Sequence, residues 1–272
     1  MERLQQKRYL QILNLLAPFI AGAIALVFGG SSGNWEDVFV EDSLTKLLTP
    51  APITFAIWGP IFFLLGLFYF YQARDLIPEK KEIEMPFVRQ VSVFFLLSSV
   101  MATVWFVTWT SGMIWGSVAA MIIYLITILA AYFRLDINLH ERTKKERLFI
   151  TSSWSMYAGW VTVATLVNST TGLVYTGFEN LPFTELQWTI ALAIVALVVY
   201  LAFLLFRRDY IFTGVGIWAF IGLSITHAFP APPSNLTIFV VSIAGVVVLA
   251  AAMLINHYFD LSSRLRSSIA EG

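Results

Sequence analysis

The stretch WTIALAIVALVVYLAFLLF, residues 188–206, decides the fold class of this chain. It contains no Asp, Glu, Lys or Arg, and it is bounded by Glu185 on one side and by Arg207 and Arg208 on the other. A helix needs about 20 apolar residues to cross the hydrocarbon core of a bilayer. Because this run has that length and carries no charge, it predicts a transmembrane helix.

Further stretches with the same properties extend this prediction to the whole chain. They cover residues 9–28, 53–73, 91–111, 114–133, 148–170, 210–229 and 235–257, and none contains a charged side chain. Hydrophobic residues make up 58% of the 272 residues and charged residues 12%, whereas soluble domains have about 45–50% and about 25%. The sequence therefore predicts an all-α integral membrane protein with eight transmembrane helices in a lipid bilayer.

The basic residues predict the direction in which these helices cross the membrane. If the N-terminus is cytoplasmic, Lys46 is the one residue among the 17 Lys and Arg that falls in an outer segment. Positive charge is retained on the cytoplasmic side of membrane proteins. The sequence therefore predicts a multi-pass protein with both termini in the cytoplasm.

Composition also excludes several classes of function. The net charge is zero, so no basic field is present to bind nucleic acid, and the chain has no cysteine for metal or thiol chemistry. The eight stretches contain no Asp, Glu, Lys or Arg, and their two histidines, His227 and His257, lie near the ends, which argues against a proton pump or a voltage sensor. No catalytic or metal-binding residue is predicted, so an enzyme is the less favoured reading.

Aromatic residues lie three or four positions apart in the second, third and fifth stretches, and this spacing places them on one helix face. We expect Pro60 to bend the second helix. The candidate ligand-binding residues of these faces are Phe55, Trp58, Pro60, Phe62, Trp105, Trp109, Tyr157, Trp160, Ala164 and Asn168.

Two interpretations of these aromatic faces remain open. The rings can simply pack the helices together. However, close packing in membranes favours small residues, so bulky rings on three helices can instead hold the backbones apart and form the walls of a slot. Such a slot would bind a flat hydrophobic ligand, which indole N–H groups and Asn168 would orient.

The fifth stretch, WSMYAGWVTVATLVN (154–168), resembles the fifth helix of the TspO/MBR family, also called translocator protein or tryptophan-rich sensory protein. Its members share the pattern Pro-Tyr-Leu-x-Trp-Val-x-Phe-Ala-x-x-Leu-Asn. The matching positions are Tyr157, Trp160, Val161, Ala164 and Asn168, whereas Met156, Val163 and Val167 depart from the pattern.

Two other stretches carry weaker parts of this resemblance. FAIWGPIF (55–62) is similar to Trp-x-Phe-Gly-Pro-Val-Trp through Gly59 and Pro60, with Ala56 and Phe62 in place of the two tryptophans. WFVTW (105–109) is similar to Asn-x-x-Trp through Trp109.

The resemblance implies a TspO-like five-helix bundle in residues 1–170. Residues 171–272 would form a three-helix extension packed in the same membrane domain, as in longer, eight-helix relatives. It also implies binding of tetrapyrroles such as protoporphyrin or haem, and of sterol-like or isoprenoid-like lipids, often by a dimer. No cofactor is required by the sequence, although a bound porphyrin or haem is compatible with it.

The leading functional hypothesis is therefore a membrane-embedded sensor or carrier that binds a flat hydrophobic small molecule. One alternative is a structural or assembly subunit of a larger membrane complex. A second alternative is an enzyme that acts on a bound pigment or lipid.

Overall fold

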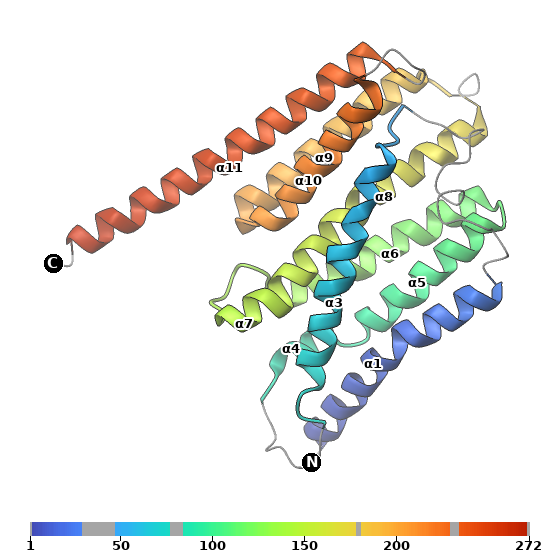
Figure 1. Ribbon diagram of the computed structural model, residues 1–272. Coiled ribbons are helices and arrows are strands. Elements are labelled where there is room, and N and C mark those ends of the chain that lie inside the picture. Colours follow the sequence, from blue (N-terminus) through green and yellow to red (C-terminus); the bar gives the residue numbers. More distant parts are fainter. Residues whose placement is uncertain (1, 29–46, 77–83, 178–180, 229–233, 271–272) are drawn as a thin grey trace.

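The computed structural model describes residues 2–28, 47–76, 84–177, 181–228 and 234–270, and all regular structure within these ranges is helical (Figure 1). The long helices are α1 (Glu2–Phe28), α3 (Trp58–Ala73), α5 (Phe94–Thr110), α6 (Ile114–Arg134), α8 (Ser153–Thr176), α9 (Glu185–Arg207), α10 (Tyr210–His227) and α11 (Leu236–Ala270). The short elements are the 3-10 helix η2 (Pro52–Ile57), α4 (Pro86–Val91), α7 (Lys144–Glu146) and the π-helix η3 (Arg147–Ser152). A long helix thus lies over each stretch of the sequence that predicts one.

Five of the described helical segments are long and apolar enough to cross a membrane. They are α6, α9, α10, α11 and the continuous segment made of η2 and α3. Helix α5 is apolar but has only 17 residues. The chain is therefore an all-helical integral membrane protein, and the number of eight passes stays a prediction.

The second helix begins differently from the prediction. Residues 52–57 form a turn of 3-10 helix, and α3 starts only at Trp58. Pro60 consequently lies in the first turn of α3, where a missing N–H leaves no intrahelical bond unmade. Pro60 thus lies near the junction of the 3-10 turn and the α-helix, and the bend expected at this residue stays a prediction.

Three other boundaries also differ. The third predicted helix is broken at Ser92, whose φ of 50° separates α4 from α5. Helix α8 continues to Thr176, so the predicted boundary at residue 170 falls inside it. Helix α11 continues well past residue 257. The sharp turn between α5 and α6 is at Gly112, whose φ of 71° is readily adopted by glycine.

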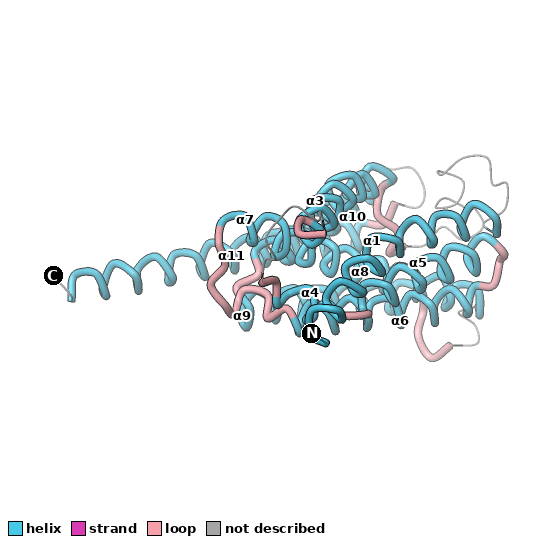
Figure 2. The backbone as a smooth tube through the Cα atoms, turned by 90° about the horizontal axis from the view of Figure 1, so that it is seen from below, coloured by secondary structure: helices cyan, strands magenta, loops and turns pink. Residues whose placement is uncertain are grey.

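Helix α8 is the central element of the bundle. It contacts α3, α6, α9 and α10. In Figure 1, α3 crosses in front and α6 lies behind, and Figure 2 shows these two helices on opposite sides with α8 between them. Helix α1 packs against α5 and α3, while α11 packs against α10 and α9. Side chains on α8 can therefore meet both the N-terminal and the C-terminal helices.

Candidate functional site

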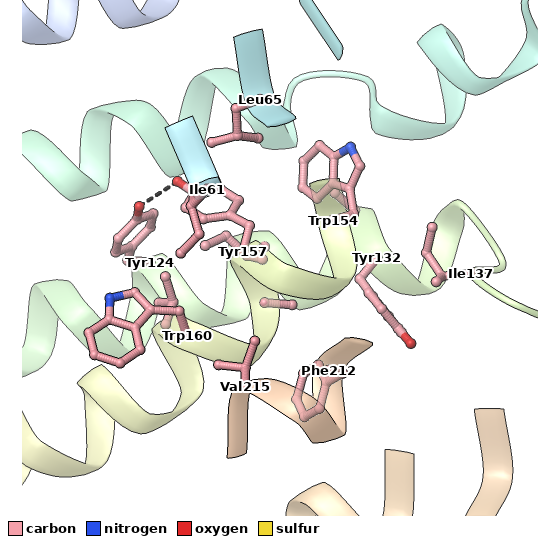
Figure 3. Packing of buried hydrophobic residues seen from close by; sticks show 14 of the residues in the cluster. Ile61, Leu65, Tyr124, Tyr132, Ile137, Trp154, Tyr157, Trp160, Phe212 and Val215 are labelled. Carbon is pink, nitrogen blue, oxygen red and sulfur yellow. Dashed lines mark hydrogen bonds between the residues drawn. The ribbon is translucent and has the colours of Figure 1, made fainter. Parts of the chain in front are cut away.

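The aromatic face of α8 is buried along two turns. Trp154 and Trp160 are 0% and 1% exposed, and Tyr157 between them is also buried. Figure 3 shows the three side chains in sequence along one helix, with Ile61 and Leu65 of α3 beside them. Because these side chains are three residues apart, they share one face of α8, and this face is buried.

Trp160 is the centre of an aromatic cluster, which we define as Phe55, Trp58, Phe62 and Trp160. The edge of the Phe55 ring meets Trp160 at a centroid distance of 5.6 Å, and Trp58 meets it in the same way at 6.3 Å. Phe62 stacks on Trp58 at 5.2 Å. The cluster therefore joins α8 to η2 and α3, and it brings together four of the ten predicted site residues.

The geometry of the cluster is that of aromatic rings in direct contact. Edge-to-face contacts are a favourable arrangement for such rings, and here they join Phe55 and Trp58 to Trp160. The slot between the helices stays a prediction. A cavity of about 20 Å³ lies between α8, α9 and α10, next to Val163, Leu166 and Tyr200, and it has room for one water molecule. None of the ten predicted site residues lines this cavity.

Two indoles, those of Trp58 and Trp160, give the cluster its polar atoms, and Trp160 is the more deeply buried of the two. Its Nε1 atom is buried and has no hydrogen-bond partner within the described part of the chain. Buried donors in proteins are nearly always paired. An unpaired N–H at the centre of an apolar cluster is what a bound ligand with an acceptor atom would satisfy.

Tyr157 is directed toward α6 rather than toward the cluster. Its hydroxyl forms a hydrogen bond with the hydroxyl of Tyr124, and both side chains are buried (Figure 3). Tyr124 was not predicted as a site residue. A signal was present in the sequence, because Tyr124 shares a helix face with Ser117, Met121 and Ile128 at spacings of four, three and four.

Asn168 lies about two helical turns beyond Trp160, and it contacts α6. Its Nδ2 atom donates to the hydroxyl of Ser117 at 3.4 Å, while its Oδ1 atom is buried without a partner within the described residues. Eight residues of helix separate Asn168 from Trp160 by about 12 Å. The amide is therefore too far away to share the acceptor that Trp160 would bind, although Ala164 between them packs against the core.

The remaining predicted residues lie elsewhere. Trp105 and Trp109 contact each other on α5 at a centroid distance of 6.4 Å, and the principal neighbours of α5 are α1 and α6. Pro60 is exposed on the first turn of α3. The structure thus divides the predicted site into the aromatic cluster, the Tyr124–Tyr157 pair, Asn168 and a separate tryptophan pair.

Sequence reasoning missed a buried carboxylate between α9 and α10. Asp209 is 1% exposed, and it accepts hydrogen bonds from the hydroxyls of Tyr132 and Ser155, both at 2.6 Å. It also accepts from the N–H of Phe212 at 3.0 Å and so caps α10. Burial raises the pKa of Asp209 above its ordinary value, and the hydrogen bonds from these donors lower it by a smaller amount. Asp209 therefore joins α6, α8 and α10 at a distance from the aromatic cluster.

Comparison with known families gives one match. A profile described as "TSPO-like protein" matches residues 11–255, which is most of the chain. The match does not stop at residue 170, and it includes α9, α10 and most of α11. Searches of curated proteins and of solved structures returned no match.

Proposed function

Because the chain belongs to the TSPO-like family, we propose that it is a membrane-embedded sensor or carrier for a flat hydrophobic ligand, such as a tetrapyrrole or a sterol-like lipid. The aromatic cluster is the proposed site. A match over residues 11–255 supports a binding role in the membrane broadly, and the side chains of the cluster support the particular class of ligand.

The observation that carries this proposal is the environment of Trp160. Its ring is 1% exposed, two aromatic rings meet it edge-on, and its N–H is unpaired within the described residues. Flat apolar walls suit a flat apolar ligand, and one fixed donor orients a ligand that carries a nitrogen or oxygen acceptor. A porphyrin has both features.

The ligand would reach Trp160 from the lipid phase. Phe62 is 63% exposed and stacks on Trp58, which in turn contacts Trp160. Rotation of these two side chains would open a path between the bilayer and the indole. Because these rings contact one another, a ligand that enters between them has to replace the ring contacts that are lost.

The proposal includes eight membrane passes with both termini in the cytoplasm. Long helices cover all eight predicted stretches, and the basic residues lie almost entirely in segments of one side. Under this topology the aromatic cluster lies within the membrane, where hydrophobic ligands accumulate.

Titration of the purified protein with protoporphyrin, followed by the absorbance of the porphyrin, tests the proposal. We expect saturable binding, and we expect Trp160→Phe to weaken it roughly 2- to 10-fold, because one hydrogen bond is lost while the ring remains. Trp188→Phe is the matched control, since Trp188 also has a buried indole N–H without a partner within the described residues but packs against Phe183 at the start of α9. A parallel titration with a fluorescent sterol separates the two ligand classes. Absence of saturable binding of either ligand would overturn the proposal.

A further inference from the structure

The turn of 3-10 helix that precedes α3 is held by α10, a helix distant in sequence. The indole Nε1 of Trp218 donates a hydrogen bond to the carbonyl of Thr54 at 2.8 Å. The N–H of Ala51 donates to the carbonyl of Gly222 at 3.0 Å. One backbone group just before this turn and one within it are therefore paired with α10.

The two segments also approach each other too closely for a side chain at Gly222. A Cβ atom added there would overlap the hydroxyl of Thr54 and would lie 2.8 Å from its Cβ. Thr54 is 1% exposed, so it has little room to move away. Contact of this kind between helices depends on a residue without a side chain.

Further contacts fix the chain just before this turn. The hydroxyl of Thr226 donates to the carbonyl of Thr49 at 3.2 Å. The N–H of Leu47 donates to a carboxylate oxygen of Glu185 at 2.8 Å, and the carbonyl of Leu47 lies 2.8 Å from Nε2 of His227. Residues 47–54 are thus attached to α9 and α10 at several points.

This attachment determines where two walls of the aromatic cluster lie. Phe55 follows Thr54 directly, and Trp58 begins α3 one turn later. Both rings meet Trp160 edge-on. Because Thr54 is clamped by α10, the position of Phe55 relative to Trp160 depends on α10 as well as on α8.

We infer that α10 positions the aromatic wall of the ligand site, with Trp218 and Gly222 as positioning residues that act through Thr54. The inference rests on the proposed function, since it concerns binding of the same flat hydrophobic ligand. Helix α10 then contributes to the ligand-binding site, and the affinity for the ligand depends on the contact between α10 and Thr54.

Three glycines of α10 provide a matched series for the test. A side chain at Gly222 would displace Thr54, one at Gly216 would overlap the ring of Tyr200 on α9, and one at Gly214 would meet no atom within 4 Å. Each glycine is replaced by alanine, and Trp218→Phe is added. Protoporphyrin affinity, the induced circular dichroism of the bound porphyrin and the thermal unfolding midpoint are measured for each variant.

We expect Gly222→Ala to weaken protoporphyrin binding by roughly tenfold and to change the shape of the induced circular dichroism, because the walls of the site move. Trp218→Phe should do the same to a smaller extent. Gly216→Ala should lower the unfolding midpoint while the folded protein keeps the affinity and the spectrum of the wild type. Gly214→Ala should leave the affinity and the spectrum unchanged and should not lower the unfolding midpoint, because alanine fits a helix interior better than glycine.

The inference is overturned if Gly222→Ala and Gly216→Ala have the same effects, or if Gly222→Ala binds protoporphyrin with the wild-type affinity and spectrum. Either result leaves the proposed function intact, because the wild type still binds. If the wild type gives no induced circular dichroism and no saturable binding, the proposed function itself fails.

Discussion

Trp160 is the residue on which the functional interpretation depends. It combines complete burial, edge contacts with two other aromatic rings and an indole N–H that is unpaired within the described residues. A purely structural tryptophan in a membrane bundle gains most from packing and usually pairs its N–H when buried. Trp154 and Trp188 also have buried indole N–H groups without a partner within the described residues. Trp160 differs from Trp154 because its cluster reaches the surface, through Trp58 and the 63% exposed Phe62 that stacks on it.

Asp209 yields a prediction about pH. Burial raises its pKa above the ordinary value of 3.8, so the folded protein binds this proton more tightly than the unfolded chain. The contribution of the raised pKa of Asp209 to the unfolding free energy is fully present below pH 3.8, and it is lost as the pH rises through the raised pKa. We expect the unfolding midpoint of the wild type, relative to that of Asp209→Asn, to increase on acidification from neutral pH.

Thermal unfolding in detergent at a series of pH values measures this difference. Asp136→Asn is the control, because Asp136 follows α6 and has a partly exposed side chain. A difference between wild type and Asp209→Asn that stays constant with pH would contradict the assignment.

At the level of single residues, the sequence indicated Trp160, Trp58 and Phe55, but it indicated neither Tyr124, the partner of Tyr157, nor Trp218, the partner of Thr54. Helical spacing predicts which side chains share a face, because this property is local. It contains no information on which neighbouring helix that face meets. Tyr124 and Trp218 were missed for this reason, since their roles arise from contacts between distant segments.

Helices α1 and α3 are joined by a buried polar seam, which we define as Lys7, Gln11, Gln72 and Asp75. Lys7 and Asp75 form an ion pair at 2.6 Å, with side chains that are 9% and 3% exposed. Gln11 Nε2 donates to Asp75 Oδ1 at 2.7 Å and to the carbonyl of Gln72 at 2.5 Å. Polar side chains inside a membrane bundle are costly unless paired, so this seam fixes the register of α1 against α3.

Removal of one partner from this seam should be strongly destabilising. We expect Asp75→Ala to cost about 3–5 kcal/mol of unfolding free energy, since it removes the buried carboxylate that pairs with both Lys7 and Gln11. The double variant Lys7→Met/Asp75→Leu should recover most of this loss, because it removes both charges. Unfolding in detergent mixtures gives the free energies.

The pair of Arg208 and Asp260 supplies the control for this experiment. Its arginine side chain is 60% exposed, so Asp260→Ala should cost about 1 kcal/mol or less. Equal losses for Asp75→Ala and Asp260→Ala would show that the seam between α1 and α3 is not buried as described.

Helix positions were predictable from the sequence, whereas helix ends were not. A long charge-free run specifies a helix in lipid because its backbone groups must pair internally. The ends depend on tertiary contacts instead: η2 is a 3-10 turn that packs against α10, and the break at Ser92 separates α4 from α5. The extra turns of α8 beyond residue 170 pack against α6, where Gly172 meets Trp115.

For the molecule as a whole, topology is the prediction that most needs a test. The chain contains no cysteine, so single cysteines can be placed without background. We expect Phe183→Cys, before α9, to react with a membrane-impermeant maleimide on intact cells. Glu141→Cys, between α6 and α7, should react only after permeabilisation. If the cysteine of Glu141→Cys is labelled on intact cells, the orientation of the protein is the opposite of the proposed one.

The most direct test of the proposed site follows the indole of Trp160 itself. The chain has nine tryptophans, and 5-fluorotryptophan labelling gives each a ¹⁹F resonance that a Trp→Phe variant can assign. On titration with protoporphyrin, ring currents of the macrocycle should shift the Trp160 and Trp58 resonances in a saturable manner, while the Trp188 resonance stays unchanged. A porphyrin that binds with saturation but leaves the Trp160 resonance where it was would contradict the assignment of the site to the aromatic cluster.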